Sequence, residues 1–201
     1  MNHIIDSPQI VDLGLSSRWS SCNLGANSPE ELGDYYAWGE IEPKRCFDRD
    51  NYRWFSQDLS TKYGMIGDSA RLNTNILTQL DIRDDVAHVV LGGSWRIPSL
   101  RDIAELYDKC EWVWTELNGI NGCIITSKVD GHTDCSIFLP AAGCIYQSDR
   151  INFGFSGQYW SSALYRDNSR NAIITTFDSN RRYKYIPHPR FIGMPIRPVC
   201  D

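Results

Sequence analysis

The sequence predicts an α+β protein, and two observations support this class. Two helical stretches lie before residue 111, and from Trp112 onward apolar and polar residues alternate in short segments separated by Gly, Asn and Asp. The chain also holds 7 Trp and 10 Tyr but only 3 Met, a balance typical of aromatic packing on strands. A length of 201 residues suffices for one buried core, so we expect residues 1–201 to form a single domain.

The first part of the chain predicts two strands followed by irregular structure. The segment "IVDLGLSSRWSSCNLGA" alternates apolar and polar residues around Gly14 and Trp19, which predicts a strand, a turn and a second strand. In "SPEELGDYYAWGE" we expect Ser28 to cap one helical turn that ends at Gly33. Residues 41–70 show no clear periodicity and are expected to form a long ordered loop.

Two helices are expected in the middle of the chain. A weak one covers Asp84 to Leu91 and ends at the following "GG". The stronger one begins after "WRIPS", where Ser99 is the N-cap and Asp102 occupies the position of the capping-box carboxylate. Its apolar stripe has helical spacing and comprises Ile103, Leu106, Tyr107 and Cys110.

Short strands are expected in the remainder of the chain, where the hydrophobic period changes to two. The predicted strand segments are "WVWTE", "GCIITSK", "CSIFLPAAG", "QYWSSAL", "NAIITTF" and "MPIRPV". We expect Trp95, Phe138 and Trp160 to lie in the core, because aromatic side chains at strand ends bury large areas.

Cysteine and histidine spacing gives no sign of a metal site or a catalytic centre. The seven cysteines form no CxxC pair and are read as small buried hydrophobic residues, although one or two disulfides remain open. The four histidines have no ligand spacing, and "GHTD" at 131–134 is read as a polar hairpin turn. Because GxSxG and HExxH are also absent, we predict no catalytic residue, metal or cofactor.

The ends of the chain and its apolar stretches bear on location. No stretch of 18 apolar residues exists, so we expect no membrane insertion. The start, "MNHIIDSPQIVDLG", lacks the basic and apolar regions of a secretion signal. We therefore expect either a component assembled inside a cell, such as part of a virion, or a cell-surface protein whose leader is missing from this chain.

Five motifs in order along the chain carry a resemblance to a known family. They are "VDLGLSSRWSSCNLGANSPEELGDYYAWGE", "GGSWRIPSLRDIAEL", "SIFLPAAG", "GQYWSS" and "IRPV". Together they resemble the major paralogous domain of gut bacteria and their phages, which belongs to the formylglycine-generating-enzyme-like branch of the C-type lectin fold. The resemblance covers almost the whole chain.

The resemblance implies a C-type lectin-like fold in which two helices flank a twisted, mostly antiparallel sheet and the termini pair as neighbouring strands. Arg96 and Arg197 match family arginines, and we expect them to hold loop carbonyls or an acid. The oxidase relatives in this fold need a pair of copper-binding cysteines near the end of the domain, whereas Cys200 stands alone after "IRPV". An enzyme is therefore the least favoured alternative. The calcium motifs of sugar-binding C-type lectins are missing.

The segment 163–194 differs in charge from the rest of the chain. It holds 6 Lys/Arg against 2 Asp/Glu, whereas residues 1–162 hold 13 against 22. The resemblance implies that this segment is the exposed ligand-binding face, which diversity-generating retroelements rewrite by mutating adenines in Asn codons. An AAC codon changed only at its adenines cannot encode Lys, Gln, Glu, Met or Trp. Those types make up 25 of the first 162 residues but only two of this segment, Lys184 and Met194.

We predict a displayed contact surface in residues 163–194. Tyr165, Arg166 and Arg170 are expected on one side of it, and the side chains of "RRYKYIPHPRF" on the other. Tyr and Arg provide large contact areas at low entropic cost, and Pro187 and Pro189 are expected to stiffen a loop. The candidate ligand-binding residues are Tyr165, Arg166, Arg170, Ile174, Thr176, Arg181, Arg182, Tyr183, Lys184, Tyr185, His188, Arg190 and Phe191.

The sequence thus predicts a non-enzymatic receptor-binding variable protein, encoded by a phage, whose partner is a protein or glycan on a cell surface and can be acidic. A bacterial surface lipoprotein or adhesin of the same fold is the main alternative. An ordinary solvated loop without a partner also remains open. Nucleic acid is disfavoured because the rest of the surface is acidic and no recognition helix or zinc finger is present. The sequence leaves the oligomeric state open.

Overall fold

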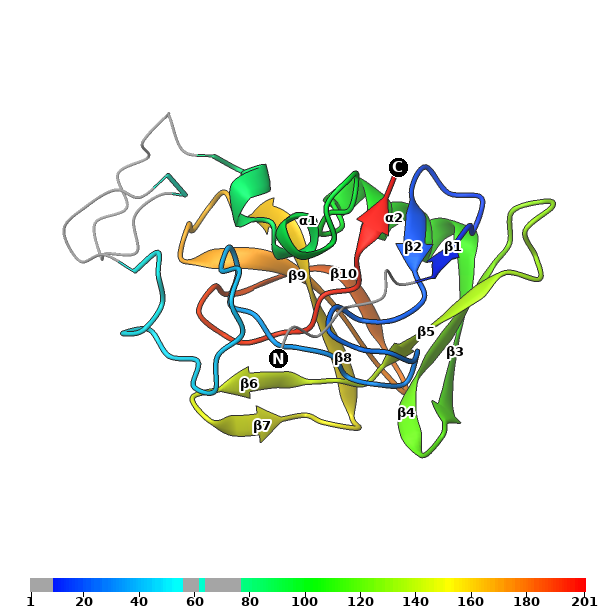
Figure 1. Ribbon diagram of the computed structural model, residues 1–201. Coiled ribbons are helices and arrows are strands. Elements are labelled where there is room, and N and C mark those ends of the chain that lie inside the picture. Colours follow the sequence, from blue (N-terminus) through cyan, green and yellow to red (C-terminus); the bar gives the residue numbers. More distant parts are fainter. Residues whose placement is uncertain (1–8, 56–61, 64–76) are drawn as a thin grey trace.

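The computed structural model describes residues 9–55, 62–63 and 77–201 (Figure 1). These residues form two α-helices, one short 3-10 helix and a set of strands whose pairings are all antiparallel. The chain is therefore an α+β protein built mostly of antiparallel sheet, as the sequence predicts. The helices run along the upper side of the molecule in Figure 1, and the β6–β7 hairpin runs along the lower side.

The strands form four small sheets. The central sheet has the order β10-β9-β8, and the others have the orders β1-β2-β11, β3-β4-β5 and β6-β7. The strands are β1 (Ile10–Val11), β2 (Arg18–Ser20), β3 (Cys110–Leu117), β4 (Ile120–Ser127), β5 (Ser136–Pro140), β6 (Cys144–Tyr146), β7 (Asp149–Ile151), β8 (Ser156–Leu164), β9 (Asn171–Asp178), β10 (Arg182–Pro189) and β11 (Val199–Cys200).

Strands β8 and β9 of the central sheet are buried on both faces, because their side chains alternate between two core clusters. On β8, Tyr159 enters one cluster and Trp160 enters the other. On β9, Phe177 joins Tyr159, whereas Ile174 joins Trp160. The Phe177 ring packs directly over Gly157, where an added Cβ would lie 2.1 Å from the ring. The framework behind the predicted surface is thus densely packed.

Both predicted helices are present. A 3-10 helix, η1 (Ile82–Asp84), leads into α1 (Val86–Leu91), which ends at Gly92 with a φ of 70° that suits glycine. The longer helix α2 (Leu100–Lys109) begins with the predicted capping box, since Ser99 and Asp102 each accept a hydrogen bond from the other's backbone N–H. Helix α2 packs against β8 and β10.

The two ends of the described chain meet at one small sheet. Strand β2 lies between β1 and β11, so the first and last strands are neighbours of the same strand. The buried Arg197 just before β11 donates to the carbonyls of Ser20, Ser21 and Phe138. Arg96 donates to the carboxylate of Asp102. The prediction that these two arginines hold loop carbonyls or an acid is confirmed.

Several local predictions are corrected. The segment after Ser28 forms a turn with a 3.2 Å hydrogen bond from the Glu31 N–H to the Ser28 carbonyl, and not a helical turn. The segment "MPIRPV" does not form the predicted strand: Met194 makes an isolated bridge with Tyr36, and only the final valine belongs to a strand, β11. The sequence analysis also missed β6, β7 and β10. Of the predicted loop at 41–70, residues 41–55 and 62–63 are irregular as expected, and the rest lies outside the described residues.

Core and cysteine predictions hold. Trp95, Phe138 and Trp160 are all buried. All seven cysteines lie within the described residues and are free thiols, most of them buried. Burial raises the pKa of Cys123 to about 12 and those of Cys110 and Cys144 to about 11, as expected of thiols that pack as hydrophobic groups. Among the described residues, no helix has the length and apolar character needed to cross a membrane.

Candidate functional site

The candidate residues gather at the two ends of β10, the edge strand of the central sheet. A strand of eight residues spans roughly 25 Å. One group lies where β10 begins, after the turn from β9. We call it the tyrosine–arginine face, and it comprises Arg181, Arg182, Tyr183, Lys184 and Tyr185. The other group lies where β10 ends and contacts the β8–β9 turn at residues 165–170. The candidate residues therefore form two sites.

An irregularity in the pairing of β10 shapes the tyrosine–arginine face. Tyr183 pairs with Thr176 and Ile186 pairs with Ile174, so Lys184 and Tyr185 together stand opposite the single residue Thr175. Such a bulge changes the direction of side chains at a sheet edge. Here both bulged residues contact α2, which lies beside this part of β10.

Helix α2 fixes the tyrosine–arginine face in place. The Tyr185 hydroxyl donates to the Leu100 carbonyl at 2.9 Å, and Lys184 forms an ion pair with Asp108 at the other end of the helix. The Tyr107 hydroxyl lies 3.2 Å from the Tyr183 carbonyl and donates to it. Even so, Tyr183 and Tyr185 remain 44% and 42% exposed. The Tyr185 side chain and the Tyr183 backbone are thus held in place, and both tyrosines still face solvent.

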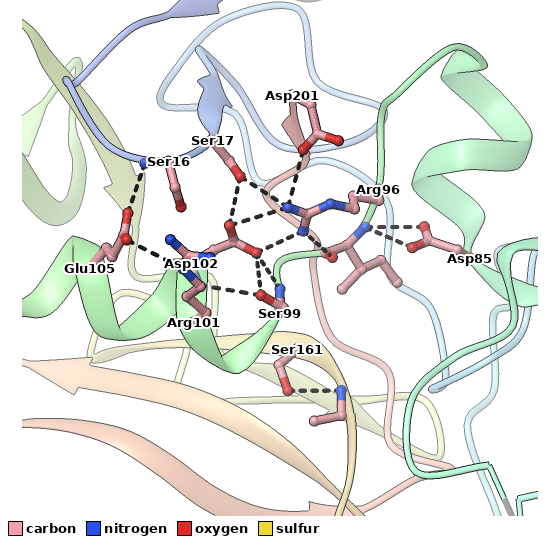
Figure 2. Close-up of polar contacts among 12 residues, drawn as sticks. Ser16, Ser17, Asp85, Arg96, Ser99, Arg101, Asp102, Glu105, Ser161 and Asp201 are labelled. Atoms are coloured by element: carbon pink, nitrogen blue, oxygen red, sulfur yellow. Dashed lines mark hydrogen bonds and ion pairs between the residues drawn. The ribbon is translucent and has the colours of Figure 1, made fainter.

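The beginning of α2 is itself anchored by a buried carboxylate, as Figure 2 shows. Asp102 accepts from Arg96 at 2.7 Å, from the Ser99 hydroxyl at 2.6 Å and from the Ser17 hydroxyl at 2.7 Å. Burial acts to raise the pKa of Asp102, but these hydrogen bonds outweigh it and lower the pKa to about 2. The helix supporting the face is therefore tied to the loop before β2 and to the segment before α2.

Two of the cationic groups of the face lie over aromatic rings. The Arg182 guanidinium lies 5.7 Å from the centroid of the Trp112 ring, and the Lys184 ammonium lies 6.0 Å from that of Tyr107. Arg181 is exposed in the turn that precedes β10. Positive charge and exposed tyrosine rings thus occupy one edge of the molecule. This arrangement suits contact with a neutral or acidic partner surface.

A second site lies at the far end of β10, where a hollow of about 170 Å³ opens. We call it the arginine hollow. It is lined by Arg49, Tyr52, Phe55, Arg170, Arg190 and Phe191, together with Asn168, Asn171 and Pro189. The Arg190 N–H donates to the Arg170 carbonyl at 3.1 Å, which joins the end of β10 to the β8–β9 turn. None of the described residues lining the hollow is acidic.

Two candidate residues are corrected because they are not displayed. Ile174 is 2% exposed and belongs to the core cluster around Trp160. Arg190 is fully buried, and burial lowers its pKa. The inward position of Ile174 follows from the alternation of β9, which the segment's unusual charge concealed. Neither residue can contact a partner at the surface in this conformation.

The remaining candidates occupy intermediate or exposed positions. His188 and Phe191 are half-buried, and the His188 ring packs against Trp160 with burial lowering its pKa. Thr176, Tyr165 and Arg170 are also half-buried, whereas Arg166 is exposed in the β8–β9 turn. The two prolines lie in β10 itself and not in a loop. An edge strand tolerates them because its outer N–H groups need no partner in the sheet.

Sequence reasoning missed three residues of the arginine hollow. Arg49, Tyr52 and Phe55 come from an irregular segment far from residues 163–194, and no periodicity marks them. The only signal in the sequence was the cluster of arginine and aromatic residues in "DRDNYRWF". The structure stacks Arg49 on Phe55, with the guanidinium 4.5 Å from the ring centroid.

The remaining chemistry of the described residues is sparse. They contain no group of three or more His, Cys, Asp or Glu side chains placed to hold a metal ion. The "GHTD" segment forms turns between β4 and β5, with the His132 N–H bonded to the Val129 carbonyl.

No protein-family model, curated protein or solved structure matches this chain.

Proposed function

We propose that this chain is a non-enzymatic receptor-binding protein of the C-type lectin-like fold. In this proposal it is the variable protein of a diversity-generating retroelement carried by a phage, and it binds a protein or glycan on a cell surface. Five sequence motifs in family order support the fold assignment. The meeting of the first and last strands at β2 agrees with it.

The tyrosine–arginine face is the observation that carries the proposal. It brings five consecutive residues, two tyrosines and three cations, to the start of an edge strand beside α2. Tyr and Arg are the residue types enriched in binding hot spots, because each provides a large amphipathic area. A surface without a partner gains nothing from two tyrosines that are 42–44% exposed, one of them anchored through its hydroxyl and the other through its backbone carbonyl.

The rigidity of the face supports binding as well. Ordering a mobile side chain at an interface costs about 0.5–1.5 kcal/mol. Because Tyr185 bonds to Leu100 and Lys184 pairs with Asp108, part of this ordering exists before a partner arrives. The framework behind the face is packed from residues that bear no contact role, such as Trp160 and Phe177. Side chains on the face can therefore change without changing the fold.

Binding of labelled protein to intact gut bacteria tests the proposal. A panel of strains is stained and scored by flow cytometry with the parent protein and with a variant carrying Arg181→Ser, Arg182→Ser, Tyr183→Ser and Tyr185→Ser. We expect at least one strain to bind the parent at least about tenfold better than the variant, since several contact residues are lost together. A melting temperature close to that of the parent shows that the variant is folded.

A matched control carries the same kind of change at exposed positions outside both the face and α2, with Arg18→Ser, Lys128→Ser, Val113→Ser and Phe155→Ser. It should bind like the parent. Staining that survives the face substitutions, or that falls equally in the control, contradicts a receptor-binding role for the tyrosine–arginine face.

A further inference from the structure

The arginine hollow contains a buried guanidinium with unused donors. Arg190 is fully buried, and its Nη1 donates to the Tyr63 carbonyl at 3.2 Å. Its Nε and Nη2 have no hydrogen-bond partner among the described residues. No ion pair with a described carboxylate is formed, and the guanidinium lies 5.7 and 5.6 Å from the centroids of the Trp38 and Tyr52 rings. A buried charge without a partner is costly, so its presence requires an explanation.

The two unpartnered nitrogens form a recognition geometry. Nε and Nη2 share one edge of the planar guanidinium, and the N–H bonds on that edge are parallel. This edge matches the two oxygens of a carboxylate, which it binds through two parallel hydrogen bonds. A neutral carbonyl offers one oxygen and no charge, and it satisfies this edge less well. The unused donors therefore favour an anion that presents two oxygens side by side.

The walls of the hollow specify what carries that anion. Its volume of about 170 Å³ is close to that of the roughly 150 Å³ protein cavity that holds a benzene ring. Tyr52, Phe55 and Phe191 supply apolar and aromatic lining, and Arg49 and Arg170 add positive charge. One ring with one carboxylate fills this space and meets these charges.

We propose that the arginine hollow binds a ring-sized organic carboxylate, with the carboxylate on the Nε–Nη2 edge of Arg190. Both nitrogens are sealed from solvent, so entry requires side-chain movement in the wall of the hollow. The ring can belong to a sugar acid or to an aromatic acid, which share this chemistry. The inference rests on the proposed function in one respect: the bound group would be part of the receptor that the chain recognises.

Titration with four small probes tests the proposal. Glucuronate and glucose differ by the carboxylate on a sugar ring, and benzoate and benzyl alcohol differ by it on an aromatic ring. Binding is measured by chemical shifts of the protein and by the rise in melting temperature with ligand concentration. We expect at least one acid to bind at least about tenfold more tightly than its neutral counterpart, because hydrogen bonds to charged groups are the strong ones. The acid that binds identifies the kind of ring.

Three variants locate the site. Arg190→Met keeps a long side chain but removes the guanidinium, so it should abolish the preference for the acid over its neutral counterpart. Arg49→Met removes a positive charge from the lining of the hollow and should weaken binding of the acid at least about threefold. This variant keeps the test valid if Arg190→Met does not fold. Arg166→Met removes an exposed arginine that does not line the hollow, and it should bind like the parent.

Equal affinity for acid and neutral probes overturns the proposal, as does an equal loss in Arg166→Met and Arg190→Met. The result is separable from that of the cell-binding test, because the tyrosine–arginine face lies at the other end of β10. If the protein stains cells but shows no preference for acid probes, the proposal for the arginine hollow is rejected and the receptor-binding role of the face stands. Acid binding without cell staining removes the receptor-binding role of the face and leaves the hollow as a small-molecule site.

Discussion

Arg190 and Arg197 are both buried, and they show how partners decide what a buried arginine does. Arg197 uses all three of its nitrogens, donating to three backbone carbonyls and to the Asn23 side chain at 2.7–3.1 Å. Arg190 uses its Nη1 alone among the described residues. Burial lowers the pKa of both, and that of Arg197 falls to about 10. The first arginine joins loops to the core, and the second has an unused binding edge.

This difference predicts opposite effects of the same substitution. Arg197→Met removes four hydrogen bonds, three of them to buried acceptors, so we expect it to lower the free energy of unfolding by roughly 3–5 kcal/mol. Arg190→Met removes an unpaired buried charge and one hydrogen bond, so the free energy of unfolding should change by no more than about 1 kcal/mol. Urea unfolding at pH 7 measures both. Equal losses in the two variants would mean that Arg190 stabilises the fold as Arg197 does.

At the scale of single elements, α2 links the framework to the tyrosine–arginine face. Its first turn is fixed by Asp102, and its two ends contact Tyr185 and Lys184. Loss of the Asp102 charge would therefore loosen both the helix and the strand beside it. The carboxylate is 3% exposed, so its effect is not screened by solvent.

The pKa of Asp102 predicts how stability depends on pH. Because its folded-state pKa is about 2, below the ordinary value of 3.8, the carboxylate stabilises the fold above pH 4, and this stabilisation is lost as pH falls toward 2. Its size is on the order of 2 kcal/mol. We expect the difference in free energy of unfolding between the parent and Asp102→Asn to shrink over this range.

Urea unfolding at several pH values between 2 and 6 measures this difference. Asp108→Asn is the matched control on the same helix, since Asp108 is exposed and its ion pair lies at the surface. A difference between the parent and Asp102→Asn that stays constant from pH 6 to pH 2 would show that the Asp102 charge does not stabilise α2.

The same two elements show where sequence reasoning succeeds and where it stops. Helix α2 was predicted with its cap because Ser99 and Asp102 act on neighbouring residues, so the spacing alone carries the signal. Strand β10 was missed because its bulge interrupts the period of two and its prolines are typical of loops. A strand at the edge of a sheet obtains its pairing from β9, and a local pattern does not record that.

At the scale of the whole molecule, long-range assembly decides the sites. The sequence placed all thirteen candidate residues on one displayed surface, whereas β9 turns Ile174 inward and the length of β10 separates the rest into two groups. The arginine hollow could not be predicted, because Arg49 and Arg190 meet only after folding. The sequence predicted correctly that Arg96 and Arg197 hold an acid or loop carbonyls. Which acid and which carbonyls they hold became known only from the structure.

The division between framework and displayed residues predicts a pattern of variation at the gene. If a retroelement diversifies residues 163–194, copies of the locus from related genomes should differ at codons for exposed positions such as Arg166, Arg181 and Tyr183. They should agree at Ala172, Ile174 and Phe177, which are 0–2% exposed, because changes there open cavities in the packed central sheet. Sequencing the locus from several genomes measures this directly.

The same sequences separate the two origins of the protein. A reverse-transcriptase gene with a near-copy of the 3′ coding region, rich in AAC codons, is expected under the retroelement proposal. A lipobox upstream of Met1 without such a copy would favour the bacterial adhesin. Differences spread evenly over buried and exposed codons contradict targeted diversification altogether. They would also be difficult to reconcile with the structure, because the side chains of β9 that fill both core clusters leave no room for free substitution.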